Sequence, residues 1–167
     1  MRQAGYTLIE ILIVLFILGI VTSVALLSIG RNDNKQMESF ANEITQIMTL
    51  AEEQAMLEPN VLGLSIAEHS FEFASLQPTK GSNKKAWLPL EDVILGKHPI
   101  PKNIQLGIVL GGGALDADKE KSKGPQIIIS MNGDMTPFTI YVGKRGEKPK
   151  YAIIGDGDGN VTNKILS

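Results

Sequence analysis

One carboxylate stands at the edge of a long apolar stretch. Glu10 directly precedes residues 11–29, in which the polar side chains are the hydroxyls of Thr22, Ser23 and Ser28. A hydroxyl can bond back to a helix carbonyl, whereas a carboxylate cannot. An ionised acid in a low-dielectric setting strongly prefers an opposite charge near it. The position of Glu10 therefore needs a reason, which is either a nearby opposite charge or a place in the headgroup region at the end of a span, where ionised residues are tolerated.

A second set of oxygen-bearing side chains lies near the C-terminus. Asp156, Asp158 and Asn160 alternate with glycines, and alternating oxygen ligands suit calcium. The calcium loop of the EF-hand would continue with Gly and would place an acid at its twelfth position, where this chain has Val161 and Ser167. A tight turn between strands explains the Asp and Gly residues equally well. We favour the turn and keep calcium as the weaker hypothesis.

Other kinds of chemistry find little support in the sequence. Cysteine is absent, which excludes disulfides, thiolate nucleophiles and cysteine-ligated zinc. We expect His69 and His98 at the surface. The glycines at residues 111–113 lack the Lys-Ser/Thr pair of a phosphate loop, so we interpret them as a hairpin loop. A net charge of -2 gives no reason to expect nucleic acid as a partner. We expect no catalytic role and no cofactor.

The apolar stretch has the length of a membrane span. As a helix, residues 11–29 would cover roughly 28 Å at ~1.5 Å per residue, close to the hydrocarbon thickness of a bilayer. A secretory signal peptide would have its cleavage site after the apolar stretch, whereas here Gly5 precedes it. Arg2 and the initial amine place the first residues in the cytoplasm. The sequence thus predicts a single span with most of the chain outside.

The remaining sequence predicts a helix followed by antiparallel strands. Apolar residues recur every three or four positions over residues 37–55, which indicates one buried helix face, and Pro59 ends the helix. Gly30 lowers helix propensity and leaves the continuity of the two helical parts open. Alternation predicts strands at residues 61–66 and 70–76. Turn residues separate further candidate strands at residues 104–110, 126–131, 138–142, 150–154 and 161–165. Residues 67–69 are predicted as a hairpin turn and residues 81–101 as a long connection. The fold class is α+β.

The first residues resemble a known processing signal. The sequence GYTLIEIL at residues 5–12, followed by the apolar stretch, resembles the class III signal of type IV pilins and type II secretion pseudopilins. The resemblance implies that a prepilin peptidase cleaves between Gly5 and Tyr6 and methylates the new amine of Tyr6. The family usually has Phe where this chain has Tyr6. In the family's model, the acid that corresponds to Glu10 pairs with the terminal amine of an adjoining subunit, and this supplies the missing cation.

The downstream sequence narrows the resemblance to the H-type minor pseudopilins (GspH). The segments that carry it are residues 63–66, 71–73, Trp87 with Pro89, 130–133 and 136–138. The FimT/FimU-type minor pilins share much of this plan, but the Trp87 region and the absence of cysteine favour secretion. The resemblance implies a pilin-like fold, in which a long N-terminal helix packs on antiparallel sheets.

The resemblance also implies a domain plan and a cellular role. Residues 1–5 would be a leader, residues 6–30 a transmembrane and filament-core helix, and residues 31–167 a periplasmic domain. The expected role is a structural subunit at or near the tip of a periplasmic pseudopilus that helps export folded proteins. It would reside in a Gram-negative inner membrane, and its partners would be other minor and major pseudopilins, the prepilin peptidase, the assembly platform and membrane lipid. The alternatives are a minor type IV pilin that primes pilus assembly and a membrane-anchored periplasmic binding module.

Overall fold

The computed structural model describes residues 8–79, 84–111, 113–115 and 124–166, without the side chains of residues 24–32 and 113–115. The chain forms two compact units, Met1–Gln36 and Met37–Ser167. Gly5 and Tyr6 lie outside the described residues.

The first unit consists, in its described part, of the beginning of helix α1 (Leu8–Leu57). The hydroxyl groups of Thr22 and Ser23 donate hydrogen bonds to the carbonyls of Leu18 and Gly19, at 2.7 and 2.8 Å. These bonds satisfy the hydroxyls within the helix, as the sequence predicted. The helical assignment includes Gly30, so α1 has no break there.

The membrane span expected at residues 11–29 stays a prediction. Within the described residues, no helix is both long enough and apolar enough to cross a membrane. The side chains of residues 24–29 lie outside the described part.

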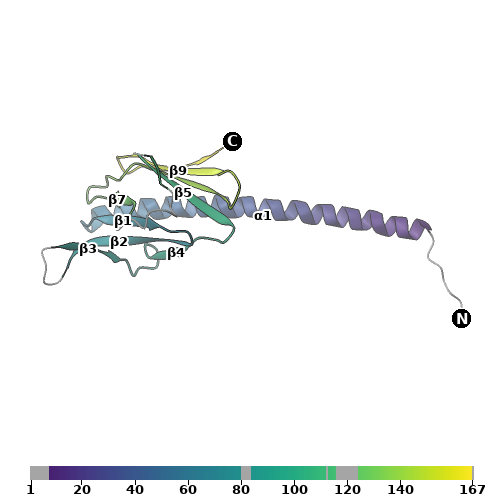
Figure 1. Cartoon of the computed structure of the whole chain (residues 1–167), viewed down its shortest axis with the longest axis horizontal. Coiled ribbons are helices and arrows are strands. Elements are labelled where there is room, and N and C mark those ends of the chain that lie inside the picture. The colour runs from purple at the N-terminus through teal and green to yellow at the C-terminus, as the bar shows by residue number, and fades with distance from the viewer. Residues whose placement is uncertain (1–7, 80–83, 112, 116–123, 167) are drawn as a thin grey trace. The chain divides into compact units, whose positions relative to one another are not determined.

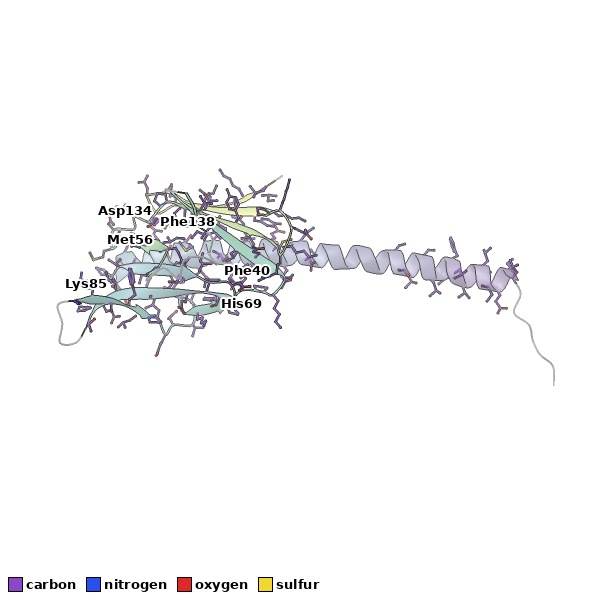
Figure 2. All side chains as sticks on the ribbon, in the orientation of Figure 1. Phe40, Met56, His69, Lys85, Asp134 and Phe138 are labelled. Carbon is purple, nitrogen blue, oxygen red and sulfur yellow. The ribbon has the colours of Figure 1, made fainter. Side chains whose placement is uncertain are left out.

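The second unit contains the C-terminal part of α1, which is amphipathic. All eight apolar positions predicted for its inner face are buried: Met37, Phe40, Ala41, Ile44, Ile47, Met48, Ala51 and Ala55. In Figure 2, Phe40 is labelled on this part of the helix. The helix ends at Leu57, two residues before Pro59, because a residue that precedes proline disfavours the helical conformation. The predicted helix face is therefore confirmed.

In the described residues, two five-stranded antiparallel sheets accompany this helix. The first sheet has the order β3-β2-β1-β7, and β4 also pairs with β2. Its strands are β1 (Leu62–Ile66), β2 (Ser70–Pro78), β3 (Lys85–Pro89), β4 (Lys97–Pro99) and β7 (Ile127–Ile129). The amide of Ala67 donates to the carbonyl of Ser70 at 2.8 Å, which confirms the predicted turn between β1 and β2.

The second sheet has the order β10-β9-β8-β5-β6. Its strands are β5 (Ile104–Leu110), β6 (Gly113–Leu115), β8 (Phe138–Lys144), β9 (Tyr151–Gly155) and β10 (Val161–Ile165). Strand β5 pairs with β6 through Leu110 and Gly113, so the two strands form a hairpin where the sequence predicted a hairpin loop. Gly112 lies outside the described residues. Strand β6 itself was not predicted from the sequence.

The two sheets lie on different sides of the C-terminal part of α1 (Figure 1). One apolar cluster joins the inner face of this helix to both sheets. Phe40 of α1 contacts Phe71 of β2, with ring centroids 6.3 Å apart and the rings tilted by 60°, an arrangement that aromatic pairs favour. The α+β fold predicted from the sequence is confirmed.

One prediction about the fold was wrong. Residues 81–101 were expected to be a long connection, but they contain β3 and β4, which both pair with β2. Both strands are short and both end in proline. The burial of β3 does not alternate, and β4 is too short for an alternating pattern to be recognised in the sequence. Proline is tolerated at the edge of a sheet, where its missing N–H costs no ladder bond. Periodicity could not detect strands whose position depends on β2.

Candidate assembly site

The carboxylate of Glu10 lies in the first turn of α1 and is exposed. This position suits an acid, because the helix dipole leaves partial positive charge at the N-terminus. Gly5 and Tyr6, the residues of the predicted cleavage site, lie outside the described residues. The cleavage, the methylation and the pairing of Glu10 stay predictions.

The side chains around Glu10 form an apolar surface on every side of the helix. Leu8 is 84% exposed, and every other described large apolar side chain up to Val21 is also largely exposed. A helix that is apolar all round is normally buried in a protein core or in lipid. This part of α1 therefore requires apolar surroundings that the first unit does not itself supply, and Glu10 is the acid within that surface.

The predicted oxygen cluster near the C-terminus forms the hairpin between β9 and β10. The carboxylate of Asp156 accepts bonds from the amides of Asp158 and Asn160 and from the side-chain amide of Asn160, each at 3.0 Å. These bonds, first that from the Asn160 side chain, lower the pKa of Asp156 below its ordinary value. Gly159 has a φ of 93°, a conformation that glycine adopts without strain.

This geometry supports the turn that the sequence favoured. Both oxygens of Asp156 are engaged by the loop itself, and the side chain of Asp158 is exposed. Within the described ranges, no three His, Asp or Glu side chains lie close enough together to hold a metal ion. The calcium hypothesis for Asp156, Asp158 and Asn160 gains no support from the arrangement.

His98 is not the surface residue that the sequence predicted. Its side chain is only 17% exposed, and its ring stacks on Phe71 with centroids 4.9 Å apart and an interplanar angle of 10°. The two residues are directly paired across β2 and β4, which explains the burial. His69 is 78% exposed, as predicted, and lies at the turn between β1 and β2 (Figure 2).

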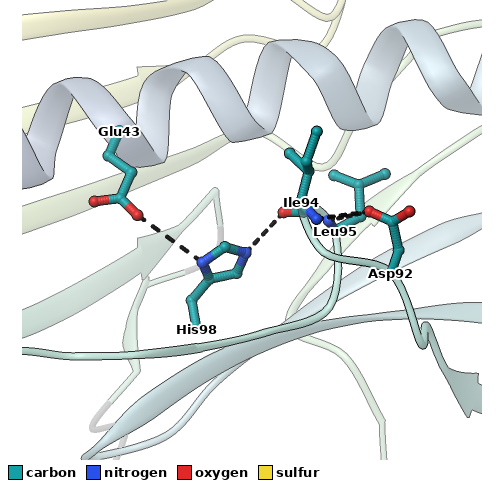
Figure 3. A network of polar contacts seen from close by, with 5 residues as sticks. All are labelled: Glu43, Asp92, Ile94, Leu95 and His98. Atoms are coloured by element: carbon teal, nitrogen blue, oxygen red, sulfur yellow. Dashed lines mark hydrogen bonds and ion pairs between the residues drawn. The ribbon is translucent and has the colours of Figure 1, made fainter.

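The His98 ring links α1 to the segment between β3 and β4 (Figure 3). Its Nε2 atom lies 2.7 Å from the carbonyl oxygen of Ile94, so Nε2 carries the hydrogen, because a carbonyl oxygen only accepts. Its Nδ1 atom faces the carboxylate of Glu43 on α1 at 3.9 Å. Three elements are therefore joined at one ring.

The same segment contains a tight turn that the sequence analysis missed. The Oδ1 atom of Asp92 accepts hydrogen bonds from the amides of Ile94 and Leu95, at 2.7 and 2.8 Å. These bonds, that from Leu95 first, lower the pKa of Asp92. Asp is a recognisable turn residue, because its side chain can accept hydrogen bonds from backbone amides a few residues later in the chain. We overlooked it because the whole region was interpreted as a connection.

The fold and the first residues together define a class of protein. An N-terminal helix with an acid near its start and an apolar surface, followed by an α+β domain, is the plan of a type IV pilin-like subunit. The family model for the "Prokaryotic N-terminal methylation motif" matches residues 1–26.

Comparison with known proteins shows which proteins the whole chain resembles. Type II secretion system protein H of Aeromonas hydrophila is 27% identical, with 90% of this chain and 86% of that protein covered. Its counterpart in Pseudomonas aeruginosa is 26% identical, with 85% and 84% covered. The solved structure of the minor pseudopilin EpsH of Vibrio cholerae has a TM-score of 0.63 at 23% identity and covers 78% of this chain and 95% of that one. It has the same fold. The resemblance to the H-type minor pseudopilins that was predicted from the sequence is confirmed.

Proposed function

We propose that this chain is a non-catalytic structural subunit of a type II secretion pseudopilus, placed at or near its tip. In this role it assembles with other minor and major pseudopilins and helps to export folded proteins across the outer membrane. The observation that carries the proposal is the start of α1, where one exposed acid, Glu10, lies in a helix surface that is otherwise apolar. Such a surface suits storage in lipid and later burial in a filament core.

Processing precedes assembly in this proposal. Prepilin peptidase cleaves between Gly5 and Tyr6 at the cytoplasmic face and methylates the amine of Tyr6. Residues 6–30 then hold the chain in the inner membrane as a single span, and residues 31–167 lie in the periplasm. The assembly platform of the inner membrane moves the subunit from lipid into the filament.

Glu10 sets the register of the subunit in the filament. Its carboxylate pairs with the methylated terminal amine of a neighbouring subunit. Two unit charges about 4 Å apart attract each other by about 4 kcal/mol at an effective dielectric constant of 20. A subunit inserted one helical turn out of register would lose this attraction and would leave a charge in apolar surroundings, where it is costly. The charge pair therefore selects one depth of insertion.

The two alternatives are not favoured. The curated relatives described above are named for type II secretion rather than for a pilus. A membrane-anchored binding module would need an anchor but neither the boundary between Gly5 and Tyr6 nor Glu10.

Intact-mass measurement of the membrane-extracted protein tests the processing step. We expect a chain that starts at Tyr6 and carries one added methyl group. A chain that starts at Met1 would refute processing and with it the filament role.

Substitution of Glu10 tests the register. Glu10→Ala should leave the second unit folded, because Glu10 lies in the first unit, and should reduce incorporation with other pseudopilins. Glu53→Ala is a matched control, since Glu53 is also an exposed acid of α1. Equal incorporation of the two variants would refute the register role proposed for Glu10.

Deletion of the gene in its host tests secretion against piliation. It should trap exported proteins inside the cell while piliation stays normal.

A further inference from the structure

The segment between β3 and β4 presents two large apolar side chains to solvent. Val93 is 93% exposed and Ile94 is 50% exposed. Single exposed apolar residues are common on protein surfaces. Here, however, the two are adjacent, and the structure holds them in place.

Contacts on both sides fix the segment that carries these side chains. The carboxylate of Asp92 bonds to the amides of Ile94 and Leu95, and the Leu95 side chain is buried in the core. A Cβ atom at Gly96 would lie 2.2 Å from the carbonyl oxygen of Asp92, so the turn closes more tightly than a larger residue would allow. The ring of His98 holds the carbonyl of Ile94 from the other side (Figure 3).

The fixed position of this segment matters for binding. A loop that becomes ordered on binding loses conformational entropy, and this loss lowers its affinity for the partner. The exposed Val93 and Ile94 already have a defined position, so a partner that covers them would not have to order the turn. Preorganisation of this kind raises affinity because less conformational entropy is lost on binding.

A groove of about 320 Å³ adjoins the turn. Leu50 of α1, Leu62 of β1 and Leu90 contribute apolar side chains to its wall, and Ile94 borders it. The carboxylates of Glu58 and Asp92 also line the groove, and both residues are exposed. The groove thus combines apolar walls with negative charge, and its volume is at the small end for ligand pockets.

We propose that this groove, together with Val93 and Ile94, is the surface that docks another pilin-like subunit through an amphipathic segment. The segment presents one or two large apolar side chains to the groove and carries Lys or Arg beside them, opposite Glu58 and Asp92. Charge complementarity of this kind selects a partner and speeds its association. The proposal rests on the proposed function, because it names the partner as a subunit of the same filament.

Photocrosslinking in cells that make the complete secretion system tests this surface. The full chain carries p-benzoylphenylalanine at Val93 and, in a control, at Thr162, an exposed residue of β10. We expect an adduct from position 93 with one other pseudopilin, mapped to a peptide that contains Lys or Arg, and no such adduct from position 162. An adduct with a protein outside the pseudopilins, or none, would overturn the proposal.

Two variants measure the contribution of the surface without disturbing the core. Val93→Asp changes a solvent-exposed side chain, and Glu58→Lys reverses the charge beside the groove. Each should lower the amount of the crosslinked pseudopilin that co-purifies by at least about ten-fold. Glu53→Lys, a charge reversal of an exposed α1 residue that does not line the groove, should have little effect. Circular dichroism should show the same fold for all three.

The outcomes separate this proposal from the proposed function. If Glu10→Ala blocks export while Val93→Asp and Glu58→Lys leave both co-purification and export unchanged, the docking surface is wrong and the filament role stands. If the chain is never processed and Glu10→Ala has no effect, the filament role fails, and the docking proposal, which rests on it, fails with it.

Discussion

In the second sheet a glycine packs directly against an aromatic ring. Phe138 of β8 and Gly155 of β9 are directly paired, and Phe138, labelled in Figure 2, is only 3% exposed. A Cβ atom built on Gly155 would lie 2.1 Å from Cε1 of Phe138 and 2.6 Å from Cζ. The ring therefore occupies the space that any side chain at position 155 would need.

We predict that Gly155→Ala destabilises the protein. Replacing Gly by Ala at a compatible position stabilises a protein by about 0.4–1 kcal/mol, because the unfolded chain becomes less flexible. Here the methyl group would displace a buried ring, and overpacking of a core costs about 1–3 kcal/mol. The net effect should be a lower free energy of unfolding by about 1–2 kcal/mol, which corresponds to a fall in Tm of several degrees.

Thermal and urea unfolding, followed by circular dichroism, measure this effect. Gly107→Ala is the control, because its added Cβ would meet only Cβ of Tyr141, at an ordinary 3.8 Å. Phe138→Leu should relieve the clash, so the double variant should show a coupling energy of about 1 kcal/mol relative to the sum of the single variants. Equal stability of Gly155→Ala and Gly107→Ala, or strict additivity in the cycle, would refute the reasoning.

Three further predictions concern the hairpin between β9 and β10 and the ring of His98. Gly159→Ala should lower the free energy of unfolding by about 1–3 kcal/mol in urea titration, because φ is 93° there; an unchanged midpoint would contradict this. His98→Ala should cost about 1–2 kcal/mol through lost stacking and hydrogen bonding, whereas His69→Ala should be nearly neutral. Because the pKa of Asp156 is lowered from its ordinary value of 3.8, the ionised carboxylate stabilises the fold above pH 3.8, and this stabilisation is lost as the pH falls through the lowered pKa. Asp156→Asn should therefore weaken the dependence of Tm on pH below 3.8. Identical pH profiles of Tm for the variant and the original chain would refute this prediction.

Local patterns in the sequence were sufficient for most of the elements. The spacing over residues 37–55 identified the buried face of α1, and alternation identified β1 and β2, because helix and strand periods are properties of consecutive residues. The signal at the start of the chain is also local. The GYTLIE motif and the position of Glu10 indicated the resemblance to pilins and pseudopilins before any contact was known.

Other features depended on pairing between distant segments. Strands β3 and β4 carry no periodic signal and exist because β2 offers them an edge. The burial of His98 follows from its place opposite Phe71, and the groove beside Val93 needs α1, β1 and the turn at Asp92 together. The sequence by itself thus determined the class of protein and the position of the acid near its N-terminus, since both depend only on consecutive residues. Only the tertiary structure decided which side chains meet at the proposed docking surface, because that surface brings together residues that are far apart in the chain.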